Sequence, residues 1–209
     1  MINVLGVAFE RRPGERSSSA HQAFALLECE GWRPEEALLT TLVVPCQWWG
    51  AADAILEAAA NADAVILFGA RKARRRALVA QFARNEAKAA ADALGDRWPG
   101  PRIAPGSAPL RAGSLCPFRL ARAMGLAGLP AKPTVACDAY VYNHCFYRLL
   151  GDPNAPPSAL VRLPLSVESA RDEAIAGHVN RMQIVAGVAA ALCFAAAAAE
   201  ARKALSVAA

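Results

Sequence analysis

One short stretch of the sequence brings together several side chains that can do chemistry. Residues 141–150, VYNHCFYRLL, place an amide, an imidazole and a thiol side by side at Asn143, His144 and Cys145. A cysteine and a histidine are the components of a thiol nucleophile and its base. Neighbouring residues on a helix or strand point in different directions, however, so His144 is poorly placed to activate Cys145. Because buried polar groups need partners, the stretch is either a satisfied core segment or a site.

The elements that position this stretch alternate between strand-like and helix-like patterns. Apolar runs predict strands, amphipathic runs predict helices, and 141–150 itself fits a buried helix or a strand-to-helix junction. The rhythm indicates one three-layer α/β/α domain over residues 1–209, with a mainly parallel, twisted sheet. Such sheets place their sites at the carboxyl ends of the strands. Strands are predicted at 2–9, 38–44, 64–68 and 159–163, and helices at 19–30, 51–60, 118–126 and 171–207.

The middle of the chain is less regular. Residues 77–94 fit either a long alanine-rich helix or a strand followed by a helix, and the prolines and glycines of 98–112 indicate an irregular excursion. The run RKARRR, from Arg71 to Arg76, is the most charged stretch. Such a run is usually a solvated face, and this one has no interleaved aromatic residue on which a base would stack. We therefore expect no nucleic-acid partner, and a contact with acidic residues stays open.

The composition limits the class of protein but does not indicate a function. The chain has 209 residues, of which 55% are hydrophobic and 20% charged, with a formal net charge of +5. A modest positive charge mainly affects solubility. The six cysteines show no C-x-x-C spacing and lie within apolar runs, which predicts free, mostly buried thiols and neither a disulfide framework nor a metal site.

The ends of the chain predict a cytoplasmic protein without a membrane anchor. The N-terminal residues MINVLGVAF have no basic region ahead of an apolar core and no small-residue cleavage site. Residues 184–199 are uninterruptedly apolar, but they are bounded by Arg181 and Glu200 and consist mostly of alanine. A bilayer needs about 20 strongly apolar residues. We expect this segment to be a helix packed on the domain or on another subunit.

The central stretch also resembles a known family. The pattern V-x-N-H-x-F-Y of residues 141–147 is similar to the active-site segment of the pyroglutamyl peptidase I family, cysteine peptidases that remove N-terminal pyroglutamate from peptides. Further blocks spread over nearly the whole chain resemble the same family. They are A-F-E-R-R-P-G (8–14) for its loop G-F-E-P-F-G-G, the strand with Pro45 for V-L-P-V, A-Q-F-A-R-N (80–85) for E-R-x-A-x-N, G-L-P (128–130) for G-I-P, and V-R-L-P (161–164) for I-H-L-P.

The resemblance fails at the residues that carry the chemistry. It implies a cysteine nucleophile, a histidine base and an acidic residue orienting the histidine, and the matching positions are Tyr142, Arg162 and Ala80. A phenol with a pKa of about 10 is a poor substitute for a thiolate. An arginine has no lone pair to accept a proton, and an alanine orients nothing. Because the loss of single members of such a unit already costs about 10⁴ to 10⁶ in rate, we predict that the family reaction does not occur.

Three interpretations of the altered site stay open. Tyr142 and Arg162 form a hydrogen-bonded or cation–π pair that fills it, or a retained pocket binds an anionic or lactam-like ligand through Arg162. In the third interpretation an active hydrolase uses a relocated or misaligned nucleophile, Cys145 or Cys137, the latter beside Asp138.

The resemblance also implies pocket residues and partners. Two phenylalanines of the family's N-terminal loop sandwich the pyrrolidone ring; Phe9 matches the first, and Arg12 replaces the second. The resemblance implies a small-molecule or peptide ligand, assembly of identical subunits and no cofactor. The candidate pocket residues are Phe9, Glu10, Arg12, Asn85, Asn143 and His144.

Overall fold

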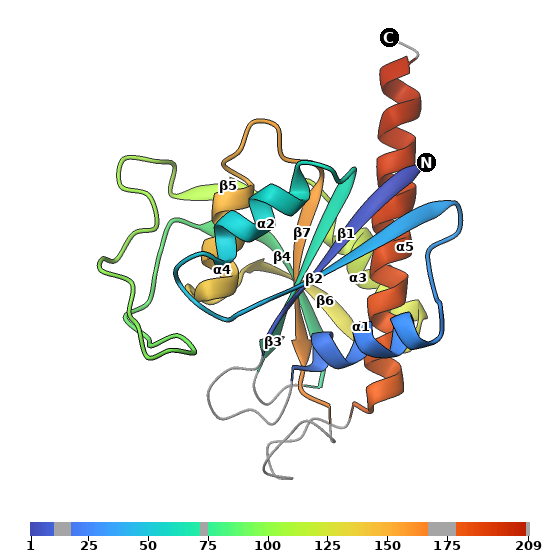
Figure 1. The fold of residues 1–209 in the computed structure, drawn as a ribbon, viewed down its shortest axis with the longest axis horizontal. Helices are drawn as coiled ribbons and strands as arrows, with labels where there is room; N and C mark the ends of the chain where they lie inside the picture. The colour runs from blue at the N-terminus through green and yellow to red at the C-terminus, as the bar shows by residue number, and fades with distance from the viewer. Residues whose placement is uncertain (11–17, 72–74, 167–178, 208–209) are drawn as a thin grey trace.

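A computed structural model describes residues 1–10, 18–71, 75–166 and 179–207. The described residues alternate strands and helices along most of the chain (Figure 1). The strands are β1 (Ile2–Phe9), β2 (Ala37–Val44), β3 (Ala64–Arg71), β4 (Ala77–Arg84), β5 (Leu110–Ala112), β6 (Ala131–Ala136) and β7 (Ser158–Pro164). The helices are α1 (Ser19–Cys29), α2 (Ala51–Ala59), α3 (Pro117–Leu126), α4 (Val141–Leu149) and α5 (Arg181–Val207).

The strands form one mainly parallel sheet, as predicted. Its order is β2-β1-β3-β7-β4-β5, and β6 also pairs with β4. β1 is parallel to β2 and β3, β3 is parallel to β7, and β4 is parallel to β6. β4 runs antiparallel to both β5 and β7. The central strands β1, β3 and β7 are apolar along most of their length because both faces of the sheet are covered.

Helices cover both faces of the sheet and give the predicted three layers. α1, α3 and α5 lie on one face, and α2 and α4 lie on the other (Figure 1). Consecutive residues of β1 supply the two cores in turn, with Val4 in the core under α1 and α5 and Leu5 in the core under α2 and α4. This alternation is what a strand buried on both sides requires. The strand patterns therefore determine the layers.

Local signals set the start of several helices. The Ser18 hydroxyl accepts a hydrogen bond from the His21 backbone N–H and caps α1. At α5 the Asn180 side chain accepts from the Gln183 N–H at 2.9 Å, while the Gln183 side chain accepts from the Asn180 N–H at 3.1 Å. This reciprocal pair is a capping box, and it starts the helix at Arg181. The predicted helical start at 171 lies outside the described residues, and the prediction of helix at 179–180 is wrong.

The prediction for residues 77–94 is only half right. β4 ends at Arg84, and no helix follows it between 85 and 94. Hydrogen bonds from two polar side chains keep this segment out of a helix. The Asn85 amide accepts from Ala104 N–H and donates to Ala104 C=O, and the Asp92 carboxylate accepts from the backbone N–H groups of Trp48, Leu94 and Asp96. These bonds offer the backbone an alternative to helix and override the propensity of its alanines.

The C-terminal helix α5 lies against the sheet and extends past its edge (Figure 1). By length and composition alone Arg181–Ser206 could cross a membrane, and half of its most apolar window is buried inside the protein. Val188, Leu192 and Ala195 belong to the core that α1 and α3 share. An interior helix of a folded domain has this same pattern, so its composition is weak evidence for a membrane.

Candidate functional site

The positions predicted to match the family's triad converge on the sheet face under α4. Arg162 of β7 pairs with Leu78 of β4, and Ala80 lies two residues further along β4. Side chains two apart on a strand share a face, so Ala80 projects to the same side as Arg162. Tyr142 is the second residue of α4, which packs on that face.

Tyr142 fills the centre of this region. Its side chain is 1% exposed, and its ring meets the Phe9 ring edge to face, with 4.8 Å between the centroids. The Tyr140 ring centroid lies 5.6 Å from that of Tyr142. Gly69 of β3 lies directly against the ring, because a Cβ added there would be 2.7 Å from the Tyr142 Cγ atom. The tyrosine therefore needs a glycine beneath it.

Arg162 is buried and held by an acid and a carbonyl. Its Nη1 atom lies 2.6 Å from Asp138 Oδ2, and its Nε and Nη2 atoms donate to the Ala70 carbonyl at 3.3 and 3.0 Å. The guanidinium carbon lies 5.8 Å from the centroid of the Tyr142 ring, within cation–π range. An arginine paired in this way balances charge and has no capacity to remove a proton.

Ala80, the third of these residues, has no group that could take part in catalysis. It is 1% exposed and belongs to the apolar core under α2 and α4. Tyr142, Arg162 and Ala80 thus contribute a packed ring, an ion-paired guanidinium and a methyl group. This set has neither a thiolate nor an imidazole, which are the groups that acyl transfer of the cysteine type needs.

Two candidate pocket residues, Asn143 and Asn85, hold backbone. The Asn143 amide accepts from the Arg84 N–H at 2.8 Å and donates to the Arg84 and Glu86 carbonyls at 2.8 and 3.2 Å. Asn85 binds Ala104 and also donates to the Ser107 carbonyl at 3.2 Å. Both side-chain amides are buried, and each accepts a hydrogen bond through its oxygen and donates hydrogen bonds through its nitrogen. They fasten the end of β4 to α4 and to the irregular segment that follows.

His144 lies in an aromatic cluster. Its ring centroid is 4.6 Å from that of Trp98 and 5.9 Å from that of Trp48. Within the described part of the chain, neither ring nitrogen has a hydrogen-bond partner. Burial lowers the pKa of His144 to about 4, and the positive charge of Arg148 acts in the same direction. The imidazole is therefore neutral near pH 7.

The cysteines proposed as relocated nucleophiles are buried. Cys145 is 1% exposed, and burial raises the pKa of its thiol far above the usual range. A thiol in that state reacts poorly. Cys137 is 5% exposed and sits one residue before Asp138, whose carboxylate faces Arg162.

The remaining candidates do not add to the site. Glu10 is exposed, and its backbone N–H donates to the Val44 carbonyl at 2.8 Å. Arg12 lies outside the described residues, as do 72–74 of the basic run, whose last residues Arg75 and Arg76 are exposed. Among the residues that the structure describes, no group of three or more His, Cys, Asp and Glu side chains could hold a metal ion.

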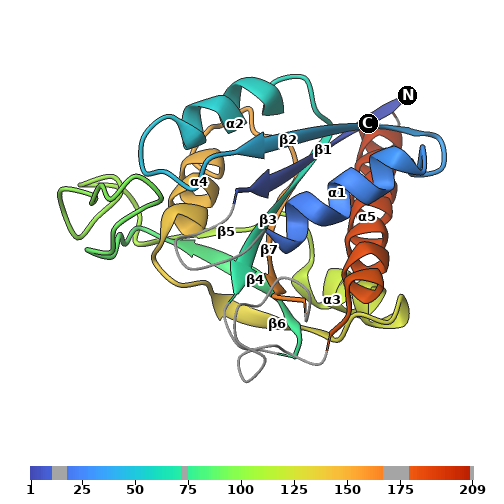
Figure 2. The same cartoon turned by 60° about the horizontal axis from the view of Figure 1, so that its bottom comes forward.

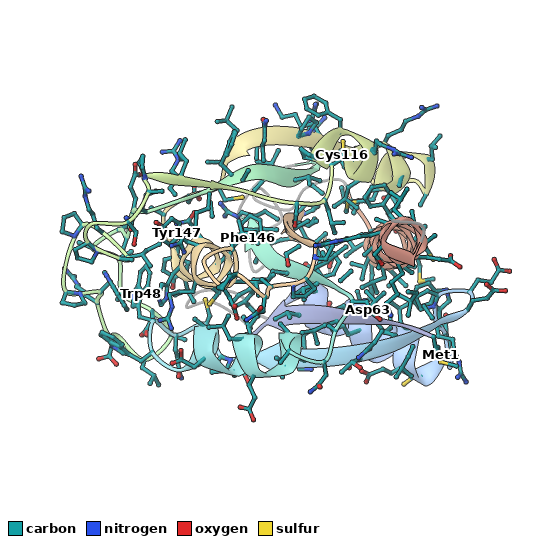
Figure 3. All side chains as sticks on the ribbon, turned by 90° about the horizontal axis from the view of Figure 1, so that it is seen from above. Met1, Trp48, Asp63, Cys116, Phe146 and Tyr147 are labelled. Carbon is teal, nitrogen blue, oxygen red and sulfur yellow. The ribbon has the colours of Figure 1, made fainter. Side chains whose placement is uncertain are left out.

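The sequence offered little signal for several residues that shape this region. Asp138 and Gly69 are the partners of Arg162 and Tyr142, and the sequence predicted neither contact. Trp48 joins the cluster from the segment after β2, and its indole donates to the Ala90 carbonyl at 3.1 Å. In Figure 3 Trp48 lies beside α4, which carries Phe146 and Tyr147. The one available hint was that Asp138 is an acidic residue just before the central stretch, where it could pair with the charge of Arg162.

The fold is that of the solved pyroglutamyl peptidases. Pyroglutamyl peptidase I of Bacillus amyloliquefaciens matches with a TM-score of 0.84 and 21% identity, covering 94% of this chain and 98% of that one. A mutant pyrrolidone carboxyl peptidase from the hyperthermophile Pyrococcus furiosus matches with a TM-score of 0.79 and 22% identity, covering 93% and 98%. No curated protein gives a significant match. The sequence pattern of the family described as pyroglutamyl peptidase matches residues 8–199, and the chain belongs to that family.

Proposed function

We propose that this family member does not hydrolyse pyroglutamyl peptides and acts as a scaffold whose former catalytic site is filled. The observation that carries the proposal is the Tyr142 ring, buried against Gly69 and Phe9 where the family motif has its nucleophile. Arg162 supports it, because its ion pair with Asp138 engages the group that would face a substrate. A filled site favours a scaffold over a retained pocket for an anionic or lactam-like ligand.

The decisive experiment is a hydrolysis assay with a pyroglutamyl amide that releases a fluorescent amine. We expect the rate with the purified wild-type protein to equal the rate without protein. Hydrolysis at a rate typical of cysteine peptidases would overturn the proposal. In that case Cys145→Ala and Cys137→Ala would locate the nucleophile, and activity retained in Tyr142→Phe would exclude the tyrosine hydroxyl.

A restoration experiment sharpens the comparison with the family motif. The variant Ala80→Glu/Tyr142→Cys/Arg162→His returns the three predicted triad residues at once, and Ala80→Glu/Tyr142→Ser/Arg162→His is its matched control. A gain of hydrolysis in the first variant alone would show that these positions account for the loss. Because a unit of this kind is strongly non-additive, the single reversions are expected to stay inactive.

The alternative of a relocated cysteine makes a separate prediction. A thiol activated for nucleophilic attack reacts with an alkylating reagent faster than the same cysteine in an unfolded peptide. Since Cys145 is buried and its pKa is raised, we expect it to react more slowly in the native protein. Mass mapping of natively alkylated protein measures this for Cys145 and Cys137 together. Fast labelling of either one would favour the alternative.

A further inference from the structure

Charge is distributed unevenly between the two edges of the sheet. Residues 64–85 and 97–137 contain no Asp or Glu, yet each segment carries six of the 23 Lys and Arg residues. The fold brings these segments together, because β4 of the first pairs with β5 and β6 of the second. Residues 28–63, which include the opposite edge strand β2, carry seven acidic residues and one basic residue. The edge formed by β5 and β6 is therefore the positive side of the protein.

Five exposed cations surround the unit formed by α3 and β6 and make up what we call the basic surface. They are Arg75 and Arg76 before β4, Arg119 and Arg122 on α3, and Lys132 on β6. The Ala77 N–H donates to the Pro130 carbonyl at 2.8 Å, which places the start of β4 beside the start of β6. Figure 2 shows α3 next to β6 at the margin of the fold. Among the described residues, none of these five cations forms an ion pair.

The outer face of α3 also exposes two large apolar side chains. Phe118 and Leu126 lie four residues before and after Arg122, a spacing that puts side chains on one face of a helix. They are 63% and 79% exposed, and Val135 on the neighbouring β6 is 64% exposed. The opposite face of α3 is buried in the core that it shares with α1 and α5. Unpaired arginines and exposed apolar groups therefore share one surface.

We propose that the basic surface binds an acidic segment of another protein, one that carries apolar side chains between its carboxylates. Four of the five cations are arginines, which bind carboxylates through two parallel hydrogen bonds. Arginine and aromatic residues are enriched where proteins bind each other, whereas lysine is depleted. Carboxylates would pair with Arg119 and Arg122, and apolar side chains would cover Phe118 and Leu126. The surface lies on the opposite face of the sheet from Tyr142, so the proposal does not depend on the loss of hydrolysis.

Other polyanions fit this surface less well. A nucleic acid offers phosphates to the arginines, but Leu126 and Val135 have no ring on which a base stacks. A helix that enters an anionic lipid surface does so through its apolar face, and that face of α3 is buried in the core. The acidic edge of a second copy would bind head to tail, which leaves a free basic edge on the last copy of any open assembly. An acidic segment with apolar residues matches both parts of the surface.

Fluorescence anisotropy with two labelled synthetic peptides of equal charge tests the proposal. One peptide repeats Glu-Glu-Leu-Glu, and the other repeats Glu-Glu-Ser-Glu. We expect the wild type to bind the leucine peptide more tightly, and Arg119→Ala/Arg122→Ala to raise its dissociation constant on the order of 100-fold. Arg97→Ala/Arg102→Ala is the control. It removes the same charge from an exposed segment far from α3 (Figures 1 and 2) and should change the constant by less than about twofold.

A second variant separates the apolar part of the surface from the charged part. Phe118→Ser/Leu126→Ser keeps all five cations, and circular dichroism checks that it folds. We expect it to bind the leucine peptide no more tightly than the wild type binds the serine peptide, and to bind the serine peptide as the wild type does. A full preference for leucine in this variant would overturn the proposal, because the apolar contacts would then lie elsewhere.

Chemical shifts of the wild type decide the matter even if a variant fails to fold. Titration with the leucine peptide should move the amide signals of α3 and β6 and leave those of residues 97–102 in place. Absence of binding, or shifts confined to other elements, would overturn the proposal. Tighter binding of a single-stranded oligonucleotide or of phosphatidylserine vesicles would overturn it as well. So would self-association of the wild type that Arg119→Ala/Arg122→Ala abolishes, because the acidic edge of a second copy would then be the occupant.

Discussion

Helix α4 carries two neighbouring residues that illustrate opposite kinds of constraint. Tyr142, at the position that the motif match predicts for the family's nucleophile, contacts its surroundings mainly through ring packing, on Gly69, Phe9 and Tyr140. Asn143, which the family motif also contains, uses its whole amide to bind the backbone of Arg84 and Glu86. The residue predicted to replace the nucleophile is thus held by ring packing, while Asn143 is held by hydrogen bonds to the backbone.

The difference follows from what each replacement leaves behind. A large aromatic ring such as that of Tyr142 needs space, and Gly69 supplies it. When a buried amide is replaced, every backbone group that it satisfied loses its partner. Arg162 lies between these cases, because it brings a buried charge and Asp138 offsets that charge. Asn143 and Arg162 therefore depend on their polar partners, whereas Tyr142 depends on the space beside Gly69.

The largest expected effect is at Asn143. Asn143→Ala leaves the Arg84 N–H and the Arg84 and Glu86 carbonyls without this partner, and we expect it to lower the free energy of unfolding on the order of 4 kcal/mol. Urea denaturation followed by circular dichroism measures the loss. Asn154→Ala is the control, since Asn154 is exposed, and it should change stability by less than about 0.5 kcal/mol.

If Asn143→Ala and Asn154→Ala were equally stable, the contrast between Asn143 and Tyr142 would fail. That result would mean that water satisfies the backbone groups of Arg84 and Glu86 as well as the Asn143 amide does, and that Asn143 serves another purpose. A ligand contact would then become the better interpretation of this residue.

A second effect depends on pH and belongs to His144. The folded protein binds a proton there only below about pH 4, whereas an ordinary histidine binds it below 6.5. The unfolded state therefore takes up more protons in this window, and stability falls as the pH is lowered from 6.5 toward 4. The difference corresponds to about 3 kcal/mol. Denaturation midpoints across this range measure it.

Two variants isolate the contribution of His144. His144→Phe keeps an aromatic ring beside Trp48 and Trp98 but has no titratable nitrogen, so most of the slope should disappear. His21→Gln changes an exposed histidine of α1 and should leave the slope in place. An unchanged slope in His144→Phe would assign the pH dependence to carboxyl groups instead.

Much of the fold was predictable because the strands bury both faces. Residues 2–9, predicted as a strand from a continuous apolar run, form β1 with those bounds, and the predicted helix at 51–60 forms α2 one residue shorter. The predicted strand at 64–68 continues to Arg71 as β3, since Gly69 stays in the ladder with β7. A glycine usually weakens or interrupts a strand, but here it gives room to the Tyr142 ring.

The site was less predictable because its contacts join distant segments. The motif located Tyr142, Arg162 and Ala80, but only the three-dimensional structure pairs Arg162 with Asp138. Long-range hydrogen bonds also decide the segment after β4, where Asp92 binds the Trp48 N–H at 2.9 Å. Alanine-rich composition predicts helix there, and no local signal announces the carboxylate's distant partner.

The smallest of the expected losses tests the packing of Tyr142 directly. Gly69→Ala introduces a Cβ 2.7 Å from the ring, and we expect it to cost about 2 kcal/mol because Phe9 and Tyr140 restrict the ring's retreat. In a Tyr142→Cys background the same change should cost far less, and urea denaturation of the four proteins measures the coupling. Gly125→Ala is the control, since it adds a methyl group to open space on α3 and should stabilise slightly. A Gly69→Ala variant as stable as the wild type would show that the ring moves aside freely, which is the behaviour of a pocket that a ligand enters.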